Sequence, residues 1–218
     1  MFRNLKVQSA RAAIILLGFT LFIGCTESGE QTLPILGRKE YKEVNGSIDT
    51  LYHTIPAFSF VDQDSMVVTE ATFTDKIYVA DFFFGTCPTI CPVMKQQMLR
   101  VYEQFKDNPQ FAILSHTIDP EHDTVAYLKN YSMNIGVPDN KTWHFVTGDK
   151  DEIYKIGSEA GYMVPVGEDS DAPGGFIHSG AFLLIDKDRR VRGIYDGTKA
   201  LQVDELMADI PKLLAEYE

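Results

Sequence analysis

The sequence predicts a single α/β domain in which a mixed β-sheet is flanked by helices. Apolar runs typical of strands alternate with segments of helical spacing along most of the chain. This alternation favours parallel strands joined by helical crossovers. Near the C-terminus, two apolar strands separated by a short charged turn predict an antiparallel hairpin that completes the sheet.

The composition is that of a globular protein of one ordinary domain. The chain has 218 residues, of which 44% are hydrophobic and 23% are charged. Its formal charge is -11, and basic residues cluster only at the N-terminus. An acidic surface of this kind favours solubility and argues against a nucleic-acid partner.

The N-terminus has the pattern of an export signal. Basic residues precede an apolar run, 12–24, which has the length of a secretory signal and is short for a membrane span. The run ends at Cys25, which follows a small residue, and this resembles a bacterial lipoprotein signal in which Cys25 is lipidated. Such signals usually carry Leu three residues before the cysteine, where this chain has Phe22. The alternative is an uncleaved short anchor; both place the domain in the bacterial cell envelope, exported and tethered at the periplasmic face.

We therefore assign residues 1–25 to a lipoprotein-type signal or anchor. Residues 26–51 are rich in polar groups and glycine, which predicts a tether. Residues 52–218 form the folded domain. In an oxidising compartment, its two cysteines are too few for a scaffold held together by disulfides. We therefore expect them to have a chemical function.

The stretch 77–98 is the centre of the predicted domain. Residues 77–84 form a nearly continuous apolar run, as expected for a strand buried on both faces. Cys87 and Cys91 follow at once, and helical spacing begins at Pro92 and continues to about Lys106. The thiols are thus predicted at a tight turn between a central strand and a helix.

The remaining elements follow from the same patterns. We expect a loop without regular structure at 167–175 and a C-terminal helix despite its internal proline. The other strands are expected at 55–61, 66–69, 111–118, 143–147, 179–185 and 191–195, and the other helices at 123–133, 149–161 and 201–214.

Two cysteines at the first strand–helix turn of such a sheet are the thioredoxin arrangement. From residue 55 onward the chain also resembles the Sco/SenC family of thioredoxin-like copper proteins. The resemblance implies a copper-binding domain that assembles the copper centre of cytochrome c oxidase. The matching segments, collinear over nearly the whole exported domain, are Ile55-Pro56 with Phe58, Asp62-Gln63-Asp64, Phe82 to Pro92, Thr117 to Pro120 with Asp123-Thr124, Trp143 with Thr147-Gly148, and His178-Ser179. One departure is Ile177, where some members carry an acidic residue.

The spacing of the cysteines favours a metal site. Three residues separate Cys87 from Cys91, one more than in ordinary thioredoxin-like reductants, which leaves room for an ion. Thiolates are soft ligands that suit Cu(I), and an imidazole extends the range to Cu(II). A structural disulfide is the alternative, but in the loop-entropy account so short a loop yields only about 2 kcal/mol.

His178 is the expected third ligand. It follows two glycines that would let its loop approach the thiols, and the Sco resemblance selects this position. His116 and His144 lie in strands and are expected to be hydrogen-bonded core residues, whereas His53 and His122 are expected in exposed loops. Two thiolates and one imidazole lack the fourth ligand of structural zinc.

Other residues near the thiols have plainer interpretations. Met94 and Met98 are one helical turn apart, as in a core stripe. The acidic loop 168–171 is expected to be solvated and mobile. Asp81, inside the buried strand, is expected either to face a polar neighbour near the thiols or to lie at the sheet edge.

Four functions are compatible with these features. The first is a membrane-tethered copper metallochaperone using Cys87, Cys91 and His178, with the CuA-bearing subunit of cytochrome c oxidase as target. The second is a thiol–disulfide oxidoreductase that reduces the target's cysteines. The third is a peroxidase, a hypothesis supported only by the fold and by Thr86 beside Cys87. The fourth is a non-catalytic interaction domain, whose function would not depend on the cysteines. Another copper chaperone or a thiol–disulfide reductant is a further expected partner, and the sequence leaves open whether the protein is an enzyme.

Overall fold

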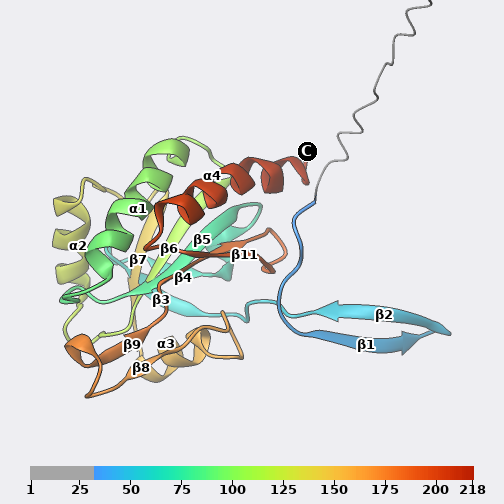
Figure 1. The fold of residues 1–218 in the computed structure, drawn as a ribbon, viewed down its shortest axis with the longest axis horizontal. Helices are drawn as coiled ribbons and strands as arrows, with labels where there is room; N and C mark the ends of the chain where they lie inside the picture. The colour runs from blue at the N-terminus through green and yellow to red at the C-terminus, as the bar shows by residue number, and fades with distance from the viewer. Residues whose placement is uncertain (1–31) are drawn as a thin grey trace, which may run out of the picture. The chain divides into compact units, whose positions relative to one another are not determined.

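The computed structural model describes residues 32–218, which form one compact unit (Figure 1). The apolar run 12–24 and Cys25 lie outside the described residues. Within 32–218, none of the helices combines the length and the apolar character needed to cross a bilayer.

A seven-stranded mixed sheet forms the middle layer of the domain. Its strand order is β11-β10-β5-β6-β7-β3-β4, and the central strands β5, β6 and β7 run parallel. The outer strands pair antiparallel with their neighbours. The bounds are β3 Ser59–Asp62, β4 Val67–Thr69, β5 Ile77–Phe83, β6 Phe111–Thr117, β7 Trp143–Thr147, β10 Ala181–Ile185 and β11 Val191–Asp196.

The continuous apolar runs of the sequence became the interior strands. Every residue of β5, β6 and β7 is buried. Strand β5 pairs with β6 in register from Ile77 opposite Phe111 to Phe83 opposite Thr117. Helices cover both faces of these parallel strands. The side chains on both faces of each strand are therefore buried.

Four helices flank the sheet. Helices α1 and α4 lie side by side on one face, joined by an ion pair between Arg100 and Asp204, and α3 lies on the opposite side of the sheet (Figure 1). A 3₁₀ turn, η1 (Glu70–Phe73), joins β4 to β5. The helices are α1 Cys91–Phe105, α2 Val125–Asn134, α3 Lys150–Gly157 and α4 Ala200–Ala215. The predicted class, an α/β domain with a mixed sheet flanked by helices, is confirmed.

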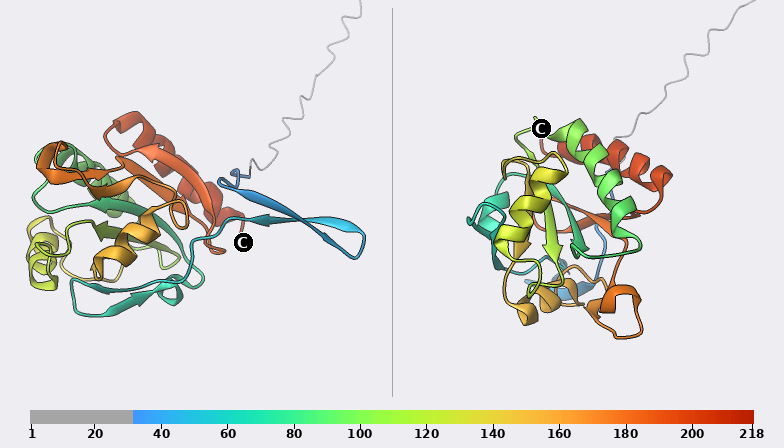
Figure 2. Two further views of the ribbon diagram at one scale, coloured as in Figure 1. Left: turned by 90° about the horizontal axis from the view of Figure 1, so that it is seen from below. Right: turned by 90° about the vertical axis from the view of Figure 1, so that its left-hand side faces the viewer.

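A β-hairpin replaces part of the expected tether. Strands β1 (Lys39–Val44) and β2 (Ser47–Tyr52) pair antiparallel outside the main sheet and project from the domain (Figure 2). Asn45 and Gly46 form the turn, with φ of 54° and 80°. Two positive φ angles are what a two-residue hairpin turn requires, and Asn-Gly is the preferred pair. From the sequence, this stretch was assigned to a tether and the hairpin was not predicted, because its polar residues give no buried face.

A second small hairpin lies where an irregular loop was expected. Strands β8 (Val166–Glu168) and β9 (Phe176–His178) pair antiparallel, and a short 3₁₀ turn, η2 (Pro173–Gly175), lies between them. The expected loop at 167–175 was wrong at its ends, where 167–168 belong to β8 and 173–175 to η2. Segments of three residues are too short to give a periodic pattern.

Candidate metal centre

The two thiols occupy the turn between β5 and α1. The Cys87 backbone N–H donates to the Phe84 carbonyl at 3.2 Å, which closes the turn. Cys91 is the first residue of α1, and Pro92 follows it in the first helical turn, where a missing N–H costs nothing. Among the described residues, both cysteines are free and buried, with 8% and 7% of their surface exposed.

His178 reaches this turn from the end of β9. Phe84 holds it there, because its ring packs against Phe176 at 5.0 Å and edge-on to the His178 ring at 5.5 Å. The loop before β9 can approach only because Gly174 lacks a side chain: a Cβ there would lie 2.9 Å from the Phe84 ring. Gly174 also has φ of 81°, a conformation that favours glycine.

The three side chains converge on one point. The Nε2 atom of His178 lies 3.4 Å from the Cys91 sulfur and 3.7 Å from the Cys87 sulfur. All three donor atoms lie within 4.8 Å of one another. With metal–sulfur and metal–nitrogen bonds of about 2.3 and 2.0 Å, trigonal angles would separate sulfur and nitrogen by about 3.7 Å. The two sulfur–nitrogen separations are close to this value, so the three side chains are placed to share a single small ion.

The local electrostatics make the two thiols unequal. Burial opposes ionisation of Cys87, but hydrogen bonds from Cys91 and Thr89 outweigh it and lower the pKa of Cys87. Burial and the neighbouring Cys87 raise the pKa of Cys91 well above its ordinary value. Burial lowers the pKa of His178, which favours the neutral imidazole that a metal needs.

A buried carboxylate that the sequence did not single out anchors the thiol turn. Asp123 is fully buried, and its Oδ2 accepts hydrogen bonds from the Gly85 N–H at 2.8 Å and the Thr117 hydroxyl at 2.6 Å. Its Oδ1 pairs with His122 Nδ1 at 2.8 Å. From the sequence, Asp123-Thr124 were placed at the start of a helix and among the segments that resemble the Sco/SenC family, and Thr124 caps α2. The contact with Gly85 spans 38 positions, so no local pattern could have indicated it.

The remaining histidines lie away from the thiols. His144 is buried and pairs with Asp62 at 3.0 Å, as expected for a hydrogen-bonded core residue. His116 is also buried, but neither ring nitrogen has a hydrogen-bond partner in the part of the chain that the structure describes, so that part of its prediction was wrong. The His122 side chain is 44% exposed, and His53 bonds to the Gly161 carbonyl at 2.7 Å and is partly buried.

Met94, Met98 and Asp81, which were given structural interpretations above, are buried. Met94 and Met98 are 2% and 1% exposed, as the core-stripe interpretation predicted. Asp81 lies in the central strand, not at an edge, and accepts a hydrogen bond from Ser115. Burial raises its pKa to about 7. In the acidic loop, Glu168 forms an ion pair with Lys150 of α3.

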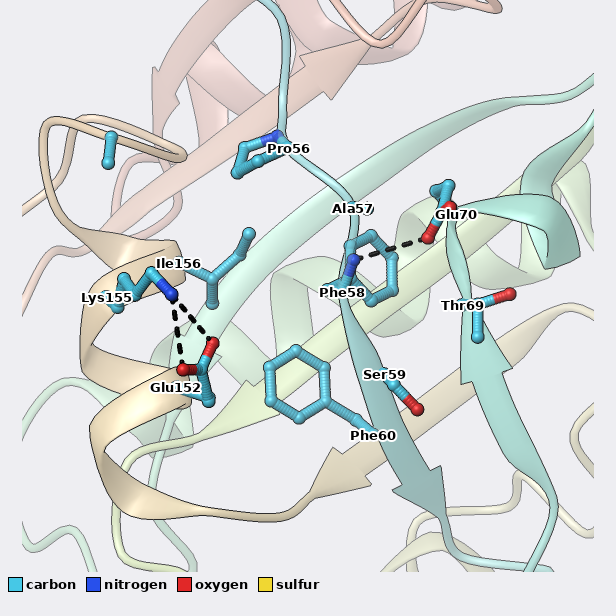
Figure 3. A pocket seen from close by; sticks show the side chains of 11 residues that line it. Pro56, Ala57, Phe58, Ser59, Phe60, Thr69, Glu70, Glu152, Lys155 and Ile156 are labelled. Carbon is cyan, nitrogen blue, oxygen red and sulfur yellow. Dashed lines mark hydrogen bonds and ion pairs between the residues drawn. The ribbon is translucent and has the colours of Figure 1, made fainter.

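A cavity of about 660 Å³ lies elsewhere, between β3, β4 and α3 (Figure 3). Phe58, Phe60 and Pro56 give it apolar walls, and its charged lining includes Glu152 and Lys155, which pair with each other. Neither a thiol nor an imidazole lines it. The candidate metal centre is therefore the buried cluster at the thiol turn and not this larger hollow.

The fold and the cluster define a class of protein: a thioredoxin-like α/β domain with two thiols and one imidazole at its first strand–helix turn. The model of the SCO1/SenC family matches residues 48–215. The chain belongs to this family. Among curated relatives, the SCO1 protein homolog of Bacillus subtilis is 30% identical over 168 residues, which cover 74% of this chain and 83% of the relative.

Solved structures agree with this assignment. A SCO1/SenC family lipoprotein from Bacillus anthracis has a TM-score of 0.66 at 26% identity, covering 73% of this chain and 94% of that one. BsSco, described as a cytochrome c oxidase assembly protein with a disulfide switch, has a TM-score of 0.64 at 28% identity over 75% and 94% of the two chains. Copper-bound ScoI of Arabidopsis thaliana shares the fold, with a TM-score of 0.61 at 23% identity over 75% and 99%.

Proposed function

We propose that this chain is a copper metallochaperone that delivers copper to the CuA site during assembly of cytochrome c oxidase. The observation that carries the proposal is the convergence of Cys87, Cys91 and His178, whose donor atoms lie within 4.8 Å of one another. The donor set suits copper as cargo: thiolates are soft ligands for Cu(I), and the imidazole is compatible with Cu(II). Three ligands leave a position through which an acceptor's ligands can enter.

The geometry supports a role in transfer better than one in permanent binding. A structural zinc site closes with four protein ligands, and within residues 32–218 this cluster offers three. The proposed target is the CuA-bearing subunit of the oxidase. Support for it comes from membership of the SCO1/SenC family and from BsSco, which is described as a cytochrome c oxidase assembly protein. Another copper chaperone or a thiol–disulfide reductant would supply copper or electrons.

The proposal includes a membrane tether. Cys25 at the end of the apolar run would carry the lipid, which would hold the domain at the periplasmic face of a bacterial membrane. The B. anthracis relative is described as a lipoprotein, which supports this localisation. If lipidation at Cys25 is correct, labelled fatty acid should be incorporated into the wild-type protein and not into Cys25→Ser. A wild-type protein that is found in the membrane without the label would favour the uncleaved anchor.

The copper proposal is tested by titrating the reduced chain anaerobically with Cu(I) in competition with a chelator, and separately with Cu(II). The variants are Cys87→Ser and His178→Ala, with His53→Ala as a matched control that removes a histidine outside the cluster. We expect one tight equivalent and a thiolate-to-copper absorption band in the wild type and in the control. Both should be weakened or lost in the two site variants. Affinity no greater than that of a simple dithiol, and indifferent to His178, would contradict the proposal.

A thiol–disulfide oxidoreductase acting on the target's cysteines is the second candidate. The unequal thiols favour it, because a Cys87 of lowered pKa suits attack on a disulfide. The Cys87 thiolate would attack the target's disulfide, release one target thiolate and form a mixed disulfide with the other sulfur. Cys91 would then attack the Cys87 sulfur, release the second target thiolate and leave a Cys87–Cys91 disulfide. His178→Ala separates the two candidates: it should weaken copper binding yet leave disulfide reduction mostly intact.

A further inference from the structure

The β1–β2 hairpin presents a strand edge that nothing covers within residues 32–218. Strand β1 pairs only with β2 in this part of the chain, and all six of its residues are exposed. The hairpin projects from the domain beyond its base, where Arg38 pairs with Glu159 and Arg190 lies over the Tyr52 ring (Figure 2). An exposed edge of this kind is a template for another strand, and a lone two-stranded hairpin is marginally stable in water.

The hydrogen-bond phase of the hairpin determines which backbone groups are free. The His53 N–H donates to the Arg38 carbonyl at 3.0 Å, so these two residues form a hydrogen-bonded pair. In an antiparallel ladder such pairs alternate. With Lys39 opposite Tyr52, the backbone groups of Glu40 and Lys42 therefore point toward β2. Those of Lys39, Tyr41 and Glu43 point outward.

The side chains of β1 are complementary to a second copy of themselves. Lys39 to Glu43 reads Lys-Glu-Tyr-Lys-Glu. When two such strands run antiparallel about Tyr41, each Lys39 faces Glu43 of the second copy, each Glu40 faces its Lys42, and the tyrosines face each other. This register uses the free backbone groups of Lys39, Tyr41 and Glu43, which would exchange about six hydrogen bonds.

We propose that β1 is a homodimerisation strand, which joins the hairpins of two copies into a four-stranded sheet with a twofold axis at Tyr41. Neighbouring registers are disfavoured by like charges. A slip of one residue places Glu40 opposite Glu43, or Lys39 opposite Lys42. A slip of two places Glu40 or Lys42 opposite its own copy. A symmetric dimer needs a surface that complements itself, and only the register at Tyr41 satisfies this for β1.

Other occupants of this edge fit less well. Residues 39–43 carry two lysines and two glutamates, so their charges cancel and give no attraction to an anionic membrane surface. Strand β2 lacks the self-complementary pattern, since pairing about Thr50 would place Asp49 opposite Leu51. The dimer is independent of copper, and a shared membrane tether would raise the effective concentration of the two strands.

The test is sedimentation velocity of the full chain in detergent micelles over a range of protein concentrations. Lys39→Glu places glutamate opposite Glu43 at two symmetric positions, whereas Lys39→Glu with Glu43→Lys restores opposite charges. Lys141→Glu is the control of equal charge change, on an exposed loop outside the hairpin. We expect a wild-type dimer, association at least about tenfold weaker in Lys39→Glu, and recovery in the double variant.

Hydrogen exchange gives a readout specific to the register. In the dimer, the amides of Lys39, Tyr41 and Glu43 should become more protected as the protein concentration rises. A wild-type chain that stays monomeric up to about 100 μM would overturn the proposal. So would a dimer that Lys39→Glu and Lys141→Glu affect alike, or one that the double variant fails to restore.

Discussion

Replacing His116 with phenylalanine is expected to remove a defined part of the protein's sensitivity to acid. The His116 ring stacks on Phe82 at 4.9 Å and packs edge-on to Phe60 at 5.2 Å, and both of its nitrogens are buried without a hydrogen-bond partner. Burial lowers its pKa from 6.5 to about 3. The native state therefore keeps this imidazole neutral, whereas the unfolded state protonates it.

The size of the effect follows from proton linkage. Between pH 6.5 and about 3 the unfolded chain binds one more proton at His116 than the folded chain, so the free energy of unfolding falls as the pH falls. Between pH 7 and pH 5 this loss is about 2 kcal/mol. His116→Phe cannot bind this proton. Its free energy of unfolding should therefore fall by about 2 kcal/mol less than that of the wild type over the same pH interval.

Urea unfolding of residues 32–218, metal-free and reduced, measures this difference at the two pH values. The comparison between pH values cancels any packing strain from the larger ring, which would shift both measurements equally. His53→Gln removes a histidine outside this aromatic cluster and is the control for the loss of a histidine. Equal pH dependence in His116→Phe and the wild type would refute the reasoning.

Three further predictions concern other buried contacts. Asp123→Asn should weaken Cu(I) binding roughly 10-fold to 100-fold in a competition titration, because the Gly85 N–H loses its hydrogen bond to a carboxylate. Unchanged affinity would show that the thiol turn does not need this carboxylate. Gly85→Ala should lower the Tm, since its Cβ would lie 2.2 Å from the Tyr127 ring, and adding Tyr127→Ala should recover much of the loss in the same melting assay. Arg192→Met should lower the Tm by roughly 6–20 °C, since it leaves buried Asp186 and partly buried Glu216 without their partner, and a drop of only a degree or two in calorimetry would contradict this.

The parts of the fold that the sequence predicted are those set by local pattern. The runs that became β5 and β6 are apolar on both faces because the strands are buried on both faces. The change to helical spacing after Pro92 marked α1 nearly to the residue. The thiol turn follows from these two elements. His178, 87 positions beyond Cys91, was identified by the family resemblance and by the glycines before it.

The parts that escaped prediction depend on contacts between distant residues or on short exposed strands. The anchor from Asp123 to Gly85 is a tertiary hydrogen bond with no sequence signature. The β1–β2 hairpin has polar residues on both faces, so it gave no alternating pattern, and its signal was the turn pair Asn45-Gly46. The unpartnered ring of His116 shows that burial can be inferred from a strand pattern while hydrogen-bond satisfaction cannot.

The position of His178 on a small separate hairpin has a mechanical consequence. The thiols belong to the central sheet through β5, whereas the imidazole belongs to β8–β9, which pairs with no strand of that sheet. An ion held by all three would link the hairpin to the core, and it would stabilise the closed form only to the extent that its affinity there exceeds its affinity for the two thiols alone. Binding of the ion would thus restrict the motion of the segment 166–178. Movement of this hairpin away from the core would remove one ligand from the ion. The β8–β9 hairpin would then act as a latch, whose opening by a docking acceptor sets the moment of release.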